Sequence, residues 1–180
     1  MEGSRAAMGL VVMGPSGTGK TTVAELLGEQ LGWTTAEADD FHPPANIEKM
    51  TGGQPLTDED RWPWLAAIRD WLTLQQEQGA DAIVTCSALK RAYRDLLRQS
   101  TADVVFIQLT GPIDLIAGRM ESRRGHFMPK TLLQSQFATL EELESDEAGV
   151  EADVTNTPDV IVDQVLHDLK LSGESAPTGP

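Results

Sequence analysis

The sequence predicts an α/β fold in which a parallel β-sheet is covered by helices on both faces. Two observations lead to this prediction. A glycine-rich stretch at residues 14–22, GPSGTGKTT, follows a short apolar run at 10–13 and precedes a segment of helical spacing. Along the rest of the chain, short apolar runs alternate with amphipathic helical patterns, as in strands joined by crossover helices.

The glycine-rich stretch fits the pattern G-x-x-x-x-G-K-[ST] of a phosphate-binding loop, or P-loop. Glycines let the backbone turn until successive N–H groups point inward, and the following helix adds the positive end of its dipole. The lysine should reach the β- and γ-phosphates, and the threonine after it should ligate Mg²⁺. The predicted nucleotide-binding residues here are Gly14, Ser16, Gly17, Thr18, Gly19, Lys20, Thr21 and Thr22.

The elements of the first half follow from apolar spacing and from capping residues. A strand over residues 10–13 leads into the loop, and the next helix should end at Gly32, since glycine favours helix C-termini. A short strand is expected over 33–38 and a short helix over 46–50. Thr57 then caps a long helix that carries three acids in its first turn.

The second half repeats the alternation of strands and helices. Apolar runs predict strands, and apolar residues at helical spacing predict the helices between them. The expected strands cover residues 82–87, 104–109 and 150–154. The expected helices follow the first of these strands and cover residues 112–120, 131–143 and 158–171.

The expected organisation is a single domain over residues 9–171. Residues 1–8 are expected to be flexible, and the tail over 172–180, with its Gly, Ser and Pro, to be disordered. A charged, glycine-bearing segment at about 121–130 is expected to be mobile. No apolar run approaches the roughly 18–20 residues of a membrane span, and no signal peptide is evident before the loop.

The net charge of −14 argues against nucleic acid or an anionic membrane as a partner. One cysteine, Cys86, excludes an internal disulfide, and together with nucleotide use this indicates the cytoplasm. Basic residues gather at 90–98 and 119–124, which in an acidic protein indicates anionic ligands. Arg91 and Arg98 are expected to be exceptions on solvated helix faces.

Five stretches of the chain resemble the signature blocks of gluconate kinase. They are GPSGTGKTT, DDFHPPANIEKM, GQPLTDEDRWPWL, CSALKRAYRDLLR and RRGHFMPKTLLQSQFATLEEL, and they cover most of residues 10–143 in order. That family phosphorylates D-gluconate on its 6-hydroxyl with ATP. The resemblance implies a P-loop kinase fold with a five-stranded parallel sheet, a mobile lid at about 121–130, and a homodimer.

The resemblance also implies roles on the acceptor side. Asp39 matches the acid expected to contact the acceptor hydroxyl and take its proton, and Asp40 beside it is the second candidate. Glu37 stands where the family has aspartate and is assigned, with Thr21, to Mg²⁺. Arg94 is preferred over Lys90, with which it shares a helix face. The predicted substrate contacts are Asp39, His42, Arg61, Ser87, Arg94 and His126.

Two arginines one helical turn apart, Arg119 and Arg123, are predicted to neutralise the phosphates during transfer. The predicted catalytic residues are therefore Lys20, Asp39 and Arg123. Two alternatives stay open: a kinase of the same fold acting on another small hydroxy acid such as shikimate, and a nucleotide-binding regulatory protein that has lost turnover. The departure at Glu37 leaves the second alternative open.

Overall fold

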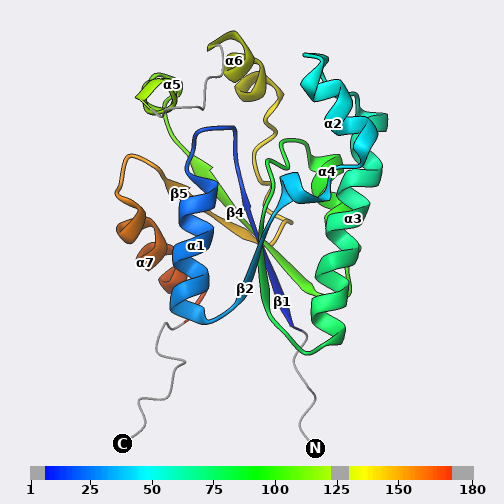
Figure 1. The fold of residues 1–180 in the computed structure, drawn as a ribbon. Helices are drawn as coiled ribbons and strands as arrows, with labels where there is room; N and C mark the ends of the chain where they lie inside the picture. The colour runs from blue at the N-terminus through cyan, green and yellow to red at the C-terminus, as the bar shows by residue number, and fades with distance from the viewer. Residues whose placement is uncertain (1–6, 123–129, 172–180) are drawn as a thin grey trace, which may run out of the picture.

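One parallel sheet of five strands lies at the centre of the structure, a computed structural model that describes residues 7–122 and 130–171. The strand order is β2-β3-β1-β4-β5, which confirms the predicted fold class (Figure 1). The strands are β1 (Met8–Met13), β2 (Thr34–Glu37), β3 (Ala82–Thr85), β4 (Asp103–Thr110) and β5 (Gly149–Asp153).

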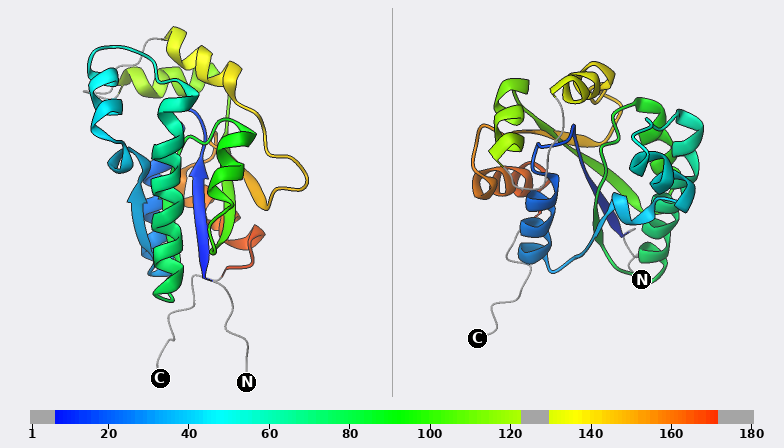
Figure 2. Two further views of the ribbon diagram at one scale, coloured as in Figure 1. Left: turned by 90° about the vertical axis from the view of Figure 1, so that its right-hand side faces the viewer. Right: turned by 45° about the horizontal axis from the view of Figure 1, so that its top comes forward.

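Helices cover both faces of the sheet and the edge where its strands end. Helices α1 and α7 lie on one face, α3 and α4 lie on the other, and α2, α5 and α6 lie beyond the carboxyl ends of the strands (Figures 1 and 2). The helices are α1 (Lys20–Leu31), α2 (Pro44–Thr51), α3 (Asp58–Glu77), α4 (Arg91–Leu97), α5 (Ile113–Ser122), α6 (Lys130–Thr139) and α7 (Pro158–Asp168), with a 3₁₀ turn η1 (Ala38–Phe41) after β2.

The central strand β1 is apolar throughout because both of its faces are buried. Leu10 and Val12 pack with α1 and α7, whereas Val11 and Met13 pack with α3 and α4. All four side chains have no exposed surface. Successive side chains of a strand point to opposite faces, so a strand between two helical layers needs an uninterrupted apolar run.

The predicted ends of two helices are confirmed by their caps. Helix α1 ends at Gly32, which has a φ of 72° and donates its N–H to Gly28 O at 2.8 Å. Helix α3 begins with a capping box: the Thr57 hydroxyl accepts from Asp60 N at 3.2 Å, and the Asp60 carboxylate accepts from Thr57 N at 2.9 Å. These bonds satisfy backbone groups that a helix end leaves without partners.

Several predicted boundaries differ from the structure. Met8 already belongs to β1, so the flexible lead-in predicted for residues 1–8 is too long. Helix α6 ends at Thr139 instead of continuing to 143, because Glu141 N donates to Leu89 O at 2.7 Å and Leu143 N donates to the Gln108 side chain at 3.1 Å. The predicted tail over 172–180 and most of the predicted lid lie outside the described residues.

A buried ion pair fixes the segment that follows α6. Arg94 of α4 has no exposed surface, and its guanidinium donates to both Glu147 carboxylate oxygens at 2.7 and 3.1 Å. It also donates to Ala88 O at 2.9 Å and Glu142 O at 3.3 Å. Burial would raise the pKa of Glu147, but the bonds from Arg94 hold it below its usual range. Arg94 therefore supports the fold, and its prediction as a substrate contact is wrong.

Arg91 is likewise more than a solvated surface charge. Its guanidinium forms bonds of 2.8–2.9 Å to Asp95, Glu144 and Asp146, which tie α4 to the same segment.

In the described residues, no helix combines the length and apolar character needed to cross a bilayer.

Replacing Arg94 alone should destabilise the protein more than replacing the whole pair. Arg94→Met leaves the Glu147 charge buried without its partner, at a cost of about 3–5 kcal/mol, whereas Arg94→Met with Glu147→Leu should recover most of that loss. Urea unfolding of both variants measures the difference. A double variant no more stable than the single one would show that the bonds to Ala88 and Glu142 matter more than the ion pair.

Candidate active site

The phosphate loop joins β1 to α1 and depends on glycine at three positions. Gly14, Gly17 and Gly19 have φ values of 143°, 82° and 92°, which L side chains rarely adopt. At Gly14 a Cβ atom would also lie 3.0 Å from the Leu109 carbonyl oxygen. The turn is therefore set by both backbone conformation and close packing against β4.

Lys20 begins α1 and folds back over this loop. Its ammonium donates to Gly14 O at 3.0 Å and Pro15 O at 3.1 Å, and the buried Thr18 hydroxyl also donates to Pro15 O, at 2.8 Å. Burial lowers the pKa of Lys20 to about 8, and the nearby Asp39 carboxylate opposes this only in part. Phosphate oxygens would give this ammonium stronger acceptors than carbonyls do.

A contact that sequence reasoning missed joins the loop to α6. The backbone N–H of Ser16 donates to the side-chain oxygen of Gln136 at 2.7 Å. The two residues are 120 positions apart, so neither motif nor helical spacing connects them. Gln136 lies in the last of the five sequence blocks, but a glutamine on a helix carries no signal of its own.

The predicted metal ligands lie together at the start of α1 and the end of β2. The Thr21 hydroxyl donates to one Glu37 oxygen at 2.5 Å, and the Thr85 hydroxyl of β3 donates to the other at 2.7 Å. Among the described residues, no three His, Cys, Asp or Glu side chains gather as a metal cage. One carboxylate beside a hydroxyl suits Mg²⁺, which commonly binds few protein ligands and completes its shell with phosphate and water.

Two exposed acids, Asp39 and Asp40, follow β2 in the turn η1. The charge of Asp39 acts on the side chains of both Lys20 and His42, where it opposes the loss of the proton that burial favours. Asp39 therefore lies near both Lys20 and His42, as an acceptor-side base would. Asp40 is exposed on the same turn.

His42 is held in a defined orientation beside these acids. Its ring stacks on Trp64, with centroids 4.4 Å apart and planes 9° from parallel. The Asn46 amide nitrogen lies 3.2 Å from His42 Nδ1 and 2.9 Å from Asp60 O, a carbonyl that can only accept. Nδ1 is therefore an acceptor, and burial lowers the pKa of His42, which favours the neutral form of the ring. Its proton then lies on Nε2, available to a ligand hydroxyl.

Beyond His42 the site becomes cationic. Arg61 of α3 is partly exposed, and its guanidinium donates to the Tyr93 hydroxyl at 3.3 Å. Ser87 stands at the end of β3, where its carbonyl accepts from Gly14 N at 3.2 Å. Ser87 thus contacts the phosphate loop through its backbone, and a substrate contact through its hydroxyl stays a prediction.

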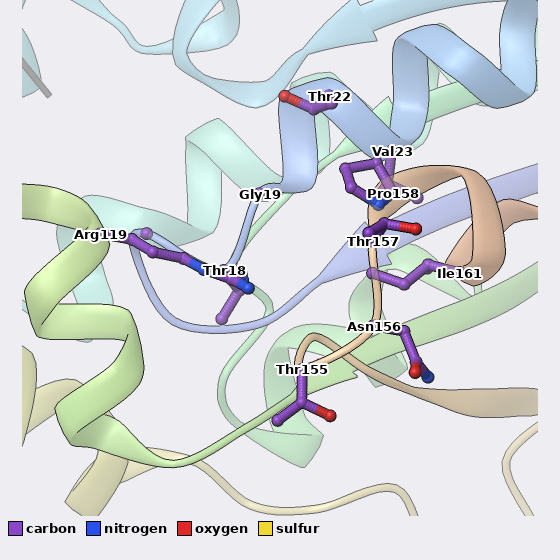
Figure 3. A pocket seen from close by; sticks show the side chains of 11 residues that line it. Thr18, Gly19, Thr22, Val23, Arg119, Thr155, Asn156, Thr157, Pro158 and Ile161 are labelled. Atoms are coloured by element: carbon purple, nitrogen blue, oxygen red, sulfur yellow. The ribbon is translucent and has the colours of Figure 1, made fainter. Parts of the chain in front are cut away.

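On the other side of the loop lies a pocket of about 300 Å³. Arg119 extends from α5 toward Thr18, and the connection between β5 and α7 forms the opposite wall (Figure 3). Sequence reasoning missed this wall, although a polar turn after the last strand is where open parallel sheets bind ligands. The lining residues are Gly17, Thr18, Gly19, Thr22, Val23, Arg119, Thr155, Asn156, Thr157, Pro158 and Ile161. Arg123 and His126, predicted for phosphate and substrate, lie outside the described residues.

A phosphate loop after the first strand of a parallel sheet defines the protein as a P-loop nucleotide-binding protein. The family model described as an AAA domain matches residues 10–143. A gluconokinase of Gluconobacter oxydans (strain 621H) is 50% identical over 87% of this chain and 88% of its own length. The chain therefore belongs to the gluconokinase family.

Two solved structures are similar over almost the whole chain. A gluconokinase from Sinorhizobium meliloti 1021 has a TM-score of 0.83 and 46% identity, covering 92% of this chain and 93% of that one. A sugar kinase from Janibacter sp. HTCC2649 has a TM-score of 0.87 and 49% identity, covering 93% and 96% of the two chains.

Nucleotide binding should be coupled to proton uptake through Lys20. Burial gives this lysine a pKa of about 8, so above pH 8 it is mostly neutral. Phosphate oxygens favour the charged form and raise its pKa, so binding at pH 8.5 should take up protons, whereas at pH 6.5 Lys20 is already charged and contributes none. Titration calorimetry in buffers of different ionisation enthalpy measures the uptake.

Lys20→Met supplies the control for this measurement. It should remove the uptake at pH 8.5 and reduce kcat by a factor of hundreds, since contacts of this kind contribute about 3–4 kcal/mol to the transition state. Unchanged uptake in Lys20→Met would assign the proton to another group, and near-normal kcat would remove Lys20 from catalysis.

Proposed function

We propose that the protein transfers the γ-phosphoryl group of ATP to the 6-hydroxyl of D-gluconate, giving 6-phosphogluconate and ADP. The observation that carries this proposal is the order of groups along the carboxyl edge of the sheet. Lys20 of the phosphate loop and His42 both lie near the charge of Asp39, and His42 also lies near the charge of Arg61. A phosphate site, a base and a cation in this order suit an acceptor with a hydroxyl at one end and a carboxylate at the other.

The nucleotide is proposed to lie along the loop, with its nucleoside in the pocket between α5 and the β5–α7 connection. Pro158 and Ile161 give this pocket apolar surface, and Asn156 gives it donors and acceptors, a mixture typical of small-molecule sites. Arg119 would then face the phosphates from α5. Arg123 is proposed to join it as a catalytic arginine, by the family resemblance.

Mg²⁺ is proposed to bind at Thr21 and Glu37. When bound with ATP, the ion neutralises phosphate charge and orients the transferring group. Thr85 holds one oxygen of Glu37 at 2.7 Å, so the carboxylate keeps a fixed direction toward the loop. The glutamate is longer than the family's aspartate, and this anchoring to β3 compensates for its extra rotational freedom.

The protein's own residues suffice to position and deprotonate the acceptor. Asp39 accepts the proton of the 6-hydroxyl while that oxygen bonds to the γ-phosphorus and the bond to the ADP oxygen breaks. The Nε2–H of His42 donates to a neighbouring sugar hydroxyl and fixes the chain. Lys20 stays protonated against the phosphates, so catalysis is mainly positioning and charge neutralisation.

The setting proposed for this reaction is the cytoplasm, with the chain as a homodimer. The cytoplasmic setting is supported by the use of ATP and by the single cysteine, Cys86. This residue is buried, and burial raises the pKa of its thiol to about 12. Such a thiol is unreactive. The dimer follows from the family resemblance. The acidic net charge of −14 supports the absence of nucleic acid and anionic membrane among the partners.

Asp39→Asn and Asp40→Asn should separate the base from its neighbour. Asp39→Asn keeps the shape and removes the proton acceptor, so kcat should fall by about 10²–10⁴. Asp40→Asn, on the same exposed turn, is the matched control and should lose much less. Steady-state ADP release with gluconate measures both, and equal losses or the reverse order would mean that Asp39 is not the base.

Arg61→Ala should impair the use of gluconate but not of glucose. A charge-assisted bond to a carboxylate is worth about 1.5–3 kcal/mol, so kcat/KM for gluconate should fall by about 10- to 150-fold. Most of the loss should appear in KM, because the contact is remote from the reacting atoms. Glucose lacks the charge and should be a poor substrate of both proteins. Parallel losses for the two sugars would show that Arg61 supports the fold or the nucleotide instead.

A further inference from the structure

A second cation, Lys90, contacts the same carboxylate and the same tyrosine ring as Arg61. The Lys90 ammonium lies 3.2 and 3.3 Å from the two Asp58 carboxylate oxygens and 5.6 Å from the centroid of the Tyr93 ring. The Arg61 guanidinium lies 3.7 Å from Asp58 and 5.7 Å from the same ring centroid. Two cations therefore share one carboxylate.

The ratio of two cations to one carboxylate distinguishes this cluster from the ion pairs that Arg91 and Lys49 make. Arg91 meets four carboxylates, from Asp95, Glu144, Asp146 and Glu147, and Lys49 pairs with Asp60 at 2.6 Å. At Asp58 the balance is one positive charge in excess, within a chain of net charge −14. The side chains of Arg61 and Lys90 are each 32% exposed, so both are accessible to a ligand.

The cluster is held rigidly by its neighbours. The Tyr93 hydroxyl donates to Asp58 at 2.5 Å and accepts from Arg61 at 3.3 Å, so one phenol joins α3 to α4. Lys90 occupies the N-cap position of α4, without a side-chain capping bond, two residues after Ala88, whose φ of 44° is unusual for a residue with a side chain. The buried Arg94 donates to Ala88 O at 2.9 Å and so fixes the backbone that presents Lys90.

The cluster also has a defined relation to the reacting end of the site. The start of α3, which carries Asp58 and Arg61, is bonded to the turn that carries Asp39: Trp64 Nε1 donates to Ala38 O at 2.7 Å, and the Asn46 amide joins His42 to Asp60 O. An extended acceptor whose hydroxyl meets Asp39 therefore directs its far end toward Arg61 and Lys90.

We propose that Lys90 and Arg61 together bind the carboxylate of the acceptor, and that Asp58 is the counter-ion whose place this carboxylate partly takes. The inference rests on the proposed function and specifies how its substrate is selected. With the ligand present, two cations face two anions, and the charge excess is removed. The site thereby favours open-chain sugar acids over the corresponding alcohols, and Lys90 replaces Arg94 as the second recognition residue on α4.

The test compares gluconate with D-glucitol, which has the same open chain and an alcohol in place of the carboxylate. Lys90→Gln should raise KM for gluconate about tenfold, with little change in kcat or in KM for ATP, and should leave glucitol unaffected. Lys90→Arg keeps the charge and should retain most of the preference for gluconate. Arg98→Gln, at the other end of α4 where Arg98 pairs with Asp95, is the matched control and should behave as wild type.

Asp58→Asn distinguishes counter-ion exchange from a structural salt bridge. Removing the competing negative charge should lower KM for gluconate about two- to fivefold, opposite in sign to Lys90→Gln, and this result holds even if Lys90→Gln does not fold. A rise in KM in Asp58→Asn, or equal losses for gluconate and glucitol in Lys90→Gln, would overturn the proposal. Failure of the wild type to phosphorylate gluconate would instead contradict the proposed function.

Discussion

The buried ion pair between Arg94 and Glu147 is the interaction on which the geometry of the acceptor side depends. Removing two charges from water is costly, and a hydrophobic pair of similar volume would often be at least as stable. Here the arginine makes further bonds to two backbone carbonyls, which an apolar side chain could not make. The pair therefore defines one arrangement of the β3–α4 connection relative to the segment that follows α6.

This arrangement of the β3–α4 connection affects both the phosphate loop and the acceptor side of the site. At one end of the β3–α4 connection, the Ser87 carbonyl holds Gly14 of the phosphate loop. At the other, Ala88 keeps its unusual backbone conformation and presents Lys90. A left-handed residue with a side chain is a local strain of about 1–3 kcal/mol that persists only where surroundings over-determine it. Here Arg94, held in place by Glu147, supplies that constraint through its bond to Ala88 O.

Local signals in the sequence were sufficient for the fold and the phosphate loop, but not for contacts between distant segments. The loop follows from residue types at fixed spacing, and Thr57 caps α3 through a partner three positions away. Arg94 and Lys90 look alike in sequence, since both are cations on one helix face. Their roles are opposite because Arg94 meets Glu147, 53 residues away, and Lys90 meets Asp58, 32 residues away. The sequence shows where the charged residues are, but not which residues they bond to in the fold.

The bond from the Ser16 N–H to Gln136 joins the phosphate loop to α6 across 120 positions of the chain. A phosphate that accepts from this N–H competes with the Gln136 oxygen, so the phosphate loop and the position of α6 are linked through one donor. The Lys20 ammonium has the same competition, between phosphate oxygens and the carbonyls of Gly14 and Pro15. Affinity for the nucleotide therefore reflects the difference between two sets of bonds, and the number of bonds to phosphate alone is a poor guide to it.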